Sequence, residues 1–422
     1  MCGGRDITEP QQRPAAQVDS AVDDIDSSAV LNGSAESSSA RHHSLIELPP
    51  LDVHTGETPI AAQERAELEA TALVGAGPVE DIAEDKSWLS HKLLNPRTIL
   101  SFLLALGIIV FIFTRLNIDP AKTWATMLTA NPLFFLAGFV VYYSAFWLRA
   151  ARWRMLLGNV GYTSNPSTSK GGSKLPSLNG LVEIIYLSWF VNCIVPAKLG
   201  DAYRSYLLKR NANISFSTTI GTILAERVVD LLVLFGLLVA SFTLVQQQLS
   251  RSATGSGDLN LGLVMLLGVV MVVALIGGLL ALRYFSHILL HFIPHRFADK
   301  FTQFQYGILH SFKRRSLPGL LGYTVVIWFL EGGRLFFVTR SLDAHAVTLS
   351  AVIFIALLSS LLTTLPLTPG GMGVVEGAVT VALGLFLKDH QLAVSIALLD
   401  RLINYWSLVV GGLILYLISR RR

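Results

Sequence analysis

The sequence predicts an all-α polytopic membrane protein, and three observations lead to this fold class. Apolar residues make up 52% of the 422 positions, whereas charged residues make up only 15%. The apolar residues come in blocks of about twenty, the length that a helix needs to cross a hydrocarbon core about 30 Å thick. Three sequence motifs also occur twice in the same order, which indicates an internal duplication.

The first 85 residues differ in composition from the rest of the chain. They hold 4 Lys and Arg against 17 Asp and Glu, and they contain no aromatic residue. Such a segment cannot bury enough apolar surface to fold, so we expect a disordered acidic tail over 1–85. The membrane domain is expected over 86–422. It carries 29 basic and 12 acidic residues, a balance that suits contact with anionic lipid.

Nine apolar runs follow the tail and predict the helices of the membrane domain. Basic residues gather before the first run, at the end of the second, before the fourth, before the sixth and at the C-terminus. Because positive residues stay on the cytoplasmic side, we expect both termini in the cytoplasm and the protein in the cell membrane. The loops 117–131, 246–258 and 341–345 are then external. The runs lie at 98–116, 132–157, 179–195, 213–245, 259–284, 317–340, 345–366, 371–387 and 391–418.

The third run, 179–195, has basic residues on both sides. Lys170 and Lys174 precede it, and a cluster from Lys198 to Arg210 follows it, so a simple span would place one cluster outside. A re-entrant hairpin resolves this conflict, because the chain can enter, break at Pro196 and return to the same side. Proline ends one half-helix and is a favourable first residue of the next.

Three motifs occur twice along the membrane domain. The first places two charges three residues apart after an aromatic pair and a leucine, the second is P-x-x-x-G, and the third is an acidic residue followed by arginine. The glycine of the second motif precedes the acid of the third by 26 residues in one half and by 27 in the other. The matched segments are Phe146–Arg152 with Trp328–Arg334, Pro196–Gly200 with Pro369–Gly373, and Glu226–Asp230 with Asp400–Asn404.

This order predicts one repeat at about 97–245 and a second at about 259–418. Each repeat contains three spans and a hairpin, and because three is an odd number the second repeat must insert upside down. Six spans and two re-entrant helical hairpins in two inverted repeats are typical of secondary transporters. The alternative is that 345–366 and 371–387 both cross fully, which gives about eight spans.

Charged side chains lie inside or at the ends of these apolar segments. Each costs about 2.5–3.5 kcal/mol at bilayer depth on insertion scales, so each must face a partner or a wet cavity. One interpretation is that the charges form buried ion pairs that only hold the helices together. The acids, which we expect to hold arginines in place or take up protons, are Glu226, Asp230, Glu331, Glu376 and Asp400.

The other interpretation is an anion-binding site. In each hairpin the helix after the proline starts near the midplane with unpaired N–H groups and the positive end of its dipole. Glycines there leave room for a ligand. Tight helix packing explains Gly332 and Gly333 at least as well, whereas a site is favoured over packing at Pro369–Glu376. The candidate substrate-binding residues are Arg152, Lys198, Gly200, Arg204, Arg227, Arg334, Gly370, Gly371, Gly373 and Arg401.

The sequence offers no candidate catalytic residue, metal site or cofactor motif. Cys2 and Cys193 lie far apart, and the histidines between His287 and His310 show no metal-ligand pairing. The basic loop that holds these histidines is expected to rest on the cytoplasmic membrane surface. There is no P-loop motif, so an ATP-driven mechanism is not built in.

The motifs resemble the flippase-like family named after the transmembrane region of lysylphosphatidylglycerol synthase. The resemblance is carried by Arg149–Trp153, Pro196–Arg204, Glu226–Asp230 and Pro369–Glu376, and it extends over about 97–418. It implies a protein that moves or modifies membrane lipids. Full synthases add a soluble C-terminal transferase domain, whereas this chain stops soon after its last apolar run. The resemblance therefore implies the flippase-like part alone.

We expect a transporter, flippase or scramblase that moves an anionic phospholipid or lipid-linked intermediate, and not an enzyme. The expected partners are membrane lipids with anionic headgroups, without nucleic acid; the oligomeric state stays open, a homo-oligomer included. One alternative is a membrane-embedded enzyme that transfers a glycosyl or aminoacyl group to lipid. The external loop 117–131 offers such an enzyme only one acid, Asp119, which counts against it. A secondary transporter of small solutes is the other alternative.

Overall fold

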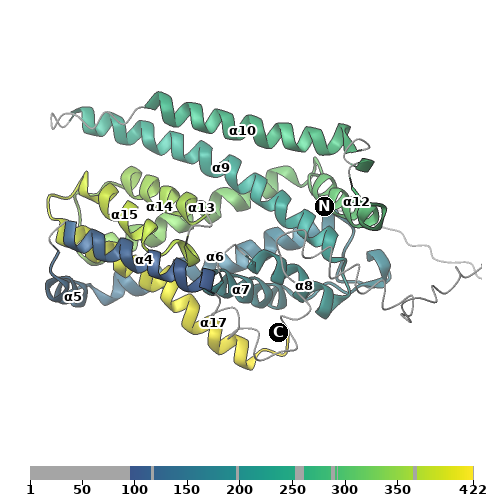
Figure 1. The fold of residues 1–422 in the computed structure, drawn as a ribbon, viewed down its shortest axis with the longest axis horizontal. Coiled ribbons are helices and arrows are strands. Elements are labelled where there is room, and N and C mark those ends of the chain that lie inside the picture. Colours follow the sequence, from purple (N-terminus) through teal and green to yellow (C-terminus); the bar gives the residue numbers. More distant parts are fainter. Residues whose placement is uncertain are drawn as a thin grey trace, which may run out of the picture. The chain divides into compact units, whose positions relative to one another are not determined.

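The structure, a computed structural model, describes residues 96–115, 118–195, 199–251, 261–286, 290–291, 293–364 and 368–421. Within these ranges every regular element is a helix (Figure 1). The all-α prediction is therefore confirmed for the described part of the chain. The predicted acidic tail, 1–85, lies outside the described residues.

Each of the nine predicted apolar runs contains a helix. The last run is formed by α16 (His390–Arg401), a π-helical turn (Leu402–Trp406) and α17 (Ser407–Ile418), which follow one another without a break. A single π-turn inside an α-helix often marks a functional site. The other eight are α4 (Pro96–Arg115), α6 (Pro132–Asn159), α7 (Leu178–Ile194), α9 (Phe216–Arg251), α10 (Leu261–Tyr284), α13 (Leu317–Ser341), α14 (Leu349–Thr364) and α15 (Val374–Gly384).

Within the described residues, further helices lie between the apolar runs, including α5 (Pro120–Leu128), α8 (Gly200–Ala212) and α12 (His295–Ser311). Helix α8 is the expected returning arm of the first hairpin. Helix α5 forms in a segment predicted as a loop, and its start has a clear local cause. The Asp119 carboxylate accepts a hydrogen bond from the Ala121 N–H at 2.9 Å, and proline occupies the first helical position.

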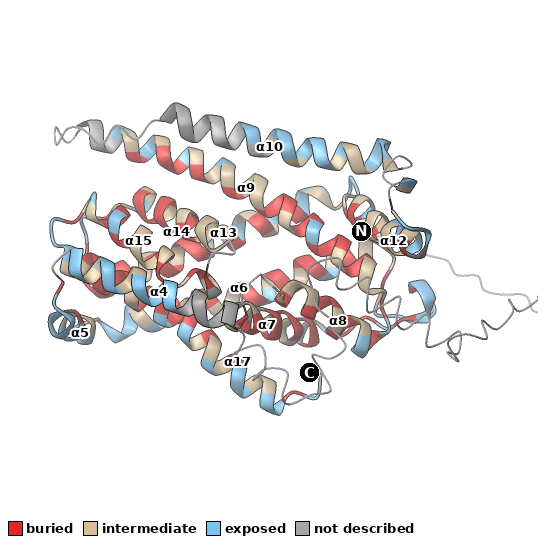
Figure 2. Ribbon diagram, viewed as in Figure 1, coloured by how far each residue is buried: buried red, intermediate tan, exposed pale blue. Residues whose placement is uncertain are grey.

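Four helices in the described part of the chain are long and apolar enough to cross a membrane. They are Pro132–Asn159, Phe216–Gln247, Leu317–Ser341 and His390–Ile418. By contrast, α7, α14 and α15 have only 17, 16 and 11 residues. In the described parts of α4, α10 and α17 many apolar residues are exposed, and Figure 2 draws the exposed residues of these helices in pale blue. The chain is a multi-pass membrane protein, since such surfaces are stable only against lipid or another apolar partner.

Helices α6 and α13 carry the first repeated motif and pack against each other over much of their length. Phe134, near the start of α6, stacks on Phe337, near the end of α13. Arg152, near the end of α6, donates a hydrogen bond to Thr324, near the start of α13, at 2.8 Å. The two helices are therefore antiparallel.

The first hairpin is formed by α7 and α8, which approach closely at Gly200. The Gly200 N–H donates to Asn192 Oδ1 at 2.8 Å, and Ser188 Oγ donates to the Gly200 carbonyl at 2.7 Å. A Cβ atom added at Gly200 would lie 2.0 Å from the Ser188 carbonyl oxygen. Glycine is thus required here by a close backbone approach. The predicted break at Pro196 lies outside the described residues.

The second hairpin is formed by α14 and α15, which are joined through a 3-10 turn at Pro369–Gly371. Gly370, Gly371 and Gly373 have φ values of 57°, 73° and 83°, a conformation that side-chain-bearing residues rarely adopt. The Glu376 carboxylate accepts a hydrogen bond from the Gly373 N–H at 2.6 Å and so closes the start of α15. The predicted helix break is confirmed, and glycine geometry is its cause.

Contacts between the two halves are reciprocal. Helix α9 of the first half packs on α12 and α14 of the second half, and in turn α16 and α17 of the second half pack on α5 and α7 of the first. Helices α12 and α5 each precede the motif-bearing helix of their half, and α14 and α7 are each the first arm of a hairpin. The same packing relation therefore occurs twice.

The basic segment before α13 differs from the predicted loop, because most of it forms α12 and packs on α9. Added Cβ atoms at Gly221 of α9 and Gly307 of α12 would each lie 2.3 Å from a backbone oxygen of the other helix. Two glycines facing each other let the helix axes come close, as in small-residue helix contacts. The expected loop is thus largely a helix, and the paired glycines allow its close packing on α9.

We predict that Gly200→Ala destabilises the hairpin between α7 and α8. Overpacking a close contact costs about 1–3 kcal/mol, so the midpoint of thermal unfolding in detergent should fall by several degrees. Gly236→Ala in α9 is the matched control, since no atom lies within 4 Å of the added Cβ. Equal midpoints for both variants would contradict the close approach at Gly200.

Candidate functional site

A cavity of about 180 Å³ lies between the helices that carry the repeated motifs. Its walls come from both halves of the chain: α6, α7 and α9 on one side, and α13, α14, the Pro369–Gly371 turn and α16 on the other. Ionised side chains form a large part of the wall. They are Arg149, Arg152, Arg227, Arg334 and Arg401, with Glu226, Asp230 and Glu331.

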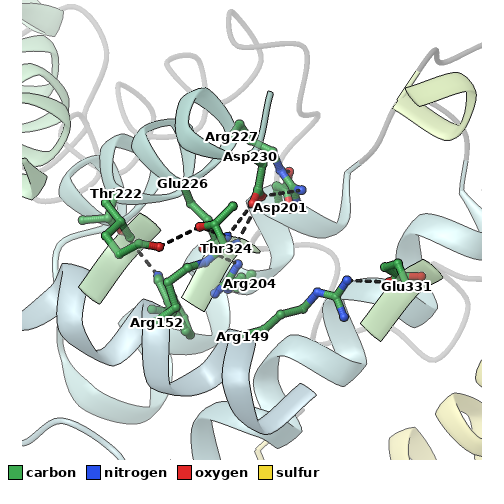
Figure 3. Close-up of polar contacts among 12 residues, drawn as sticks. Arg149, Arg152, Asp201, Arg204, Thr222, Glu226, Arg227, Asp230, Thr324 and Glu331 are labelled. Carbon is green, nitrogen blue, oxygen red and sulfur yellow. Dashed lines mark hydrogen bonds and ion pairs between the residues drawn. The ribbon is translucent and has the colours of Figure 1, made fainter. Parts of the chain in front are cut away.

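Arg152 is the centre of the first charged cluster, which Figure 3 shows in close-up. Its guanidinium pairs with Glu226 at 2.7 Å and also with Asp230, and it donates to Thr324 at 2.8 Å. Glu226 and Asp230 lie four residues apart on α9 and share one helix face, so both carboxylates reach the same arginine. Arg152 is only 1% exposed, so this pairing is what makes its charge tolerable inside the protein.

Arg204 supports the first cluster from the side of α8. It pairs with Glu226 at 3.2 Å, and its guanidinium lies 3.7 Å from the centre of the Trp153 ring. Unlike Arg152, it does not belong to the described wall of the cavity. The structure therefore places this predicted substrate-binding residue behind Glu226, where it neutralises and orients that carboxylate.

Arg334 is the centre of the second cluster. It pairs with Asp400, and it also lies 3.4 Å from Glu331. Glu331 in turn accepts a hydrogen bond from Arg149 at 2.6 Å across the contact between α6 and α13 (Figure 3). Arg149 and Glu331 occupy the same position in the two copies of the first motif. The two halves are thus joined by an ion pair between equivalent positions.

Arg227 and Arg401, which also occupy equivalent positions, each bind the returning arm of their own hairpin. Arg227 pairs with Asp201 of α8 at 3.0 Å, and Arg401 pairs with Glu376 of α15 at 3.0 Å. Arg401 also donates to the Gly371 carbonyl at 3.1 Å. The Arg227 side chain is 36% exposed, whereas that of Arg401 is 6% exposed. Arg227 is therefore the cavity arginine that a ligand would reach most easily.

The hairpin glycines are mainly structural. Gly370 lines the cavity, but Gly200, Gly371 and Gly373 are absent from its described wall. The N–H groups of Gly200 and Gly373 already donate to Asn192 and Glu376, so they are not offered to an anion. At each predicted helix-start site one N–H group is thus already bonded within the protein, and the arginines supply most of the positive surface of the cavity. Lys198, another predicted ligand, lies outside the described residues.

Several residues of the site were not predicted as such. Arg149 was noticed only as part of a motif, and Asp201 could have been found from its place directly after the motif glycine Gly200. Asn404 donates to Asp400 at 3.0 Å in the position that Asp230 holds in the first half. The Tyr405 hydroxyl donates to the Cys193 carbonyl at 3.1 Å, which links the π-turn to the end of α7. No sequence signal marked Tyr405.

Charge complementarity indicates the kind of ligand. Across the described residues, the network joins six arginines to six carboxylates, the latter being Asp201, Glu226, Asp230, Glu331, Glu376 and Asp400. Five of these arginines but only three of the carboxylates line the cavity. The wall therefore favours an anion over a cation, because positive side chains outnumber negative ones along it.

These features define the class of protein: a polytopic helical membrane protein with a charged cavity between its two halves. The chain belongs to the lysylphosphatidylglycerol synthase transmembrane region family, whose model matches residues 98–412. The resemblance inferred from the motifs is thereby confirmed over nearly all of the predicted membrane domain.

Relatives of the chain include proteins with and without a stated activity. A UPF0104 membrane protein of Methanocaldococcus jannaschii is 36% identical over 233 residues, which are 55% of this chain and 95% of the relative. A UPF0104 membrane protein of Pyrococcus horikoshii is 25% identical over 321 residues, 71% of this chain and 91% of the relative. The glycosyltransferase AglD of Haloferax volcanii is 28% identical over 346 residues, 73% of this chain but 52% of that protein. The chain thus spans about half the length of AglD.

We predict that Arg152→Ala strongly destabilises the protein. The substitution leaves Glu226 and Asp230 without their shared partner, and breaking a buried pair costs about 3–5 kcal/mol. Thermal unfolding in detergent measures the loss. The control is Arg154→Ala on the same helix, where the exposed arginine donates only to Ser164.

Replacing the whole cluster should recover most of this stability. Arg152→Met and Arg204→Met combined with Glu226→Gln and Asp230→Asn remove two cations and two anions together, so no buried charge of the cluster is left unpaired. If Arg152→Ala were as stable as Arg154→Ala, the cluster would not be the buried ion-pair network described above.

Proposed function

We propose that this protein moves an anionic phospholipid or lipid-linked intermediate across the bilayer, as a flippase or scramblase. One observation carries the proposal: a buried cavity with an arginine-rich wall lies inside a bundle of membrane-length helices. An apolar environment tolerates such a wall only if the charges are paired or meet a ligand. A headgroup phosphate supplies the anion, and its acyl chains can stay in the surrounding lipid.

The proposed topology is two inverted repeats, each of three spans and a re-entrant hairpin. Antiparallel packing of α6 and α13 supports it, because these helices carry the same motif. Their contacts are also reciprocal: Arg152 bonds Thr324, and the equivalent Arg334 lies 5.6 Å from the ring of Tyr142, the equivalent of Thr324. Reciprocal contacts of this kind arise around a two-fold axis. The short helices α7, α14 and α15 suit arms that enter the membrane without crossing it.

In this function the arginines attract the phosphate and the carboxylates set its affinity. Guanidinium groups bind phosphate oxygens through two parallel hydrogen bonds. The acids Glu226, Asp230 and Glu331 hold the arginines in place before the lipid arrives, and they keep the site from binding so tightly that release stops. The expected setting is the cell membrane with both termini in the cytoplasm, as the distribution of basic residues suggests.

A lipid-modifying enzyme is the second candidate, and the similarity to AglD favours it. An enzyme would leave a chemically changed lipid, whereas a transporter leaves it unchanged. Mass spectrometry of lipids incubated with the purified protein and candidate donors separates the two. A small-solute transporter would move a soluble anion and leave transbilayer lipid exchange at the background rate.

We predict opposite membrane sides for the loops that follow α6 and α13. In a background with both native cysteines replaced by serine, single cysteines are placed at the exposed positions Ser167 and Ala346. A membrane-impermeant maleimide added to intact cells should label Ala346→Cys, and Ser167→Cys only after permeabilisation. Labelling of both from the outside would contradict inverted repeats.

We also predict that the purified protein accelerates lipid movement in liposomes and that Arg227 is required for it. Bleaching of a fluorescent phosphatidylglycerol by external dithionite measures the rate. Arg227→Gln should lower that rate at least about 10-fold, because a charge-assisted hydrogen bond contributes about 1.5–3 kcal/mol. Arg227 is partly exposed, so its loss is tolerated by the fold better than loss of Arg152.

Two controls accompany the transport measurement. Arg154→Gln removes a charge from an exposed site outside the cavity wall and should leave the rate unchanged. If liposomes with the wild-type protein move phosphatidylglycerol across the bilayer no faster than protein-free liposomes do, the proposed function is refuted.

A further inference from the structure

We infer that Arg149 of α6 and Trp328 of α13 together form the phosphate receptor of the cavity, one donor from each half. This inference rests on the proposed function and names the groups that recognise its substrate. Neither residue follows from the broken-helix sites expected from the sequence. Both line the cavity, and both carry a buried N–H group that is left without a partner.

Arg149 is a preorganised guanidinium. One of its nitrogens, Nη2, donates to Glu331 at 2.6 Å, and its Cζ atom lies 4.5 Å from the centre of the Trp189 ring. These contacts fix the plane of the group. The other terminal nitrogen, Nη1, is buried and finds no hydrogen-bond partner in the described part of the chain. The side chain is 8% exposed, so bulk water does not simply replace that partner.

Trp328 supplies the second donor. Its indole Nε1 is buried and also lacks a partner among the described residues. Indole N–H can only donate, and buried donors are almost always satisfied in proteins, so an acceptor is expected there. The contact of Arg152 with Thr324 and that of Arg149 with Glu331 bracket position 328 in the antiparallel register. Trp328 therefore lies at the level of Arg149 along the α6–α13 contact.

The two donors call for a ligand with several acceptor oxygens and negative charge. A phosphate group has both, and a fixed guanidinium is the side chain best suited to it. Other polar groups in the wall, Asn192 of α7 and Ser359, Ser360 and Thr363 of α14, suit a hydroxyl-bearing headgroup better than an acyl chain. The ligand is accordingly the phosphate of a small polar headgroup.

Binding at this receptor connects the two halves through the ligand. Arg149 already bridges them through Glu331, and the phosphate adds a second bridge from Arg149 to Trp328. An anion next to Glu331 also repels that carboxylate, which weakens the resting bridge when the substrate arrives. The substrate thus replaces part of the contact that holds the halves together.

The test measures binding in detergent, separately from transport. The probe is dihexanoyl phosphatidylglycerol, titrated into the purified full chain and followed by calorimetry. Trp328→Phe keeps the ring but removes the N–H, and Arg149→Lys keeps the charge but removes the second donor nitrogen. Each variant should bind the probe about 10-fold more weakly or worse, the effect of one hydrogen bond to a charged group.

Matched controls use the same substitutions at exposed positions outside the cavity wall. Trp124→Phe changes a tryptophan that is 63% exposed on α5, and Arg154→Lys changes an exposed arginine of α6. Both should bind the probe as the wild type does. Size-exclusion profiles and thermal midpoints establish that each variant is folded, and Arg149→Lys still tests the receptor if Trp328→Phe does not fold.

Three outcomes would overturn the inference. The first is that Trp328→Phe and Arg149→Lys both bind the probe as tightly as the wild-type protein does. The second is that the wild-type protein binds the neutral analogue dihexanoylglycerol as tightly as it binds the probe. The third is that the wild-type protein binds inorganic phosphate but not the lipid probe. The last would assign the receptor to free phosphate. Lipid movement in liposomes is measured independently of binding. If the wild-type protein moves lipid while both variants bind the probe normally, the receptor is refuted and the proposed function stands.

Discussion

The fold depends on one constraint: a charge buried among membrane helices must be paired. Arg152 satisfies it by binding Glu226 and Asp230 of α9 and Thr324 of α13, and thereby fixes three helices around one guanidinium. Because an unpaired charge at that depth is so costly, these contacts decide which helices can be neighbours. The apolar surfaces alone would not decide which helices are neighbours, since lipid tails are as apolar as the helix faces. Specific packing in this protein therefore begins with its ion pairs and its glycine contacts.

Duplication explains why the pairs are arranged as they are. Arg152 with Glu226 and Arg334 with Asp400 are the same interaction in the two halves, and both repeat around the contact between α6 and α13. Identical copies would bring like charges together where equivalent positions meet. Arg149 and Glu331 avoid this repulsion, because one copy carries a cation and the other an anion at the same motif position. Opposite charges at this motif position thus turn a contact between the two halves into an ion pair.

The cavity follows from the same arrangement. Paired charges line the space, and Tyr405 donates to the Cys193 carbonyl and lies against Gly370. The π-turn at Leu402–Trp406 directly follows Arg401 and joins α16 to α17. Tyr405 lies within this turn, so the turn determines the direction of its side chain. An arginine-rich space between two linked halves suits an anionic headgroup, and donors from both halves let one ligand act on their contact.

The sequence by itself determined the membrane class, the positions of the four described helices of membrane length, the repeated motifs and the family. Hydrophobic length and local motif chemistry are properties of short segments, so they can be read without a fold. It also singled out the acids Glu226, Asp230, Glu331, Glu376 and Asp400, since a charge in an apolar run is visible without a fold. Only the tertiary structure decided which charge binds which, and that Arg204 lies behind Glu226. It also decided that Asn192 and Glu376 accept hydrogen bonds at the two helix starts. Finally, it showed that Arg149 and Trp328 each keep a buried donor without a partner among the described residues. Pairing and burial are relations between distant segments, and no local pattern in the chain encodes the distance between them.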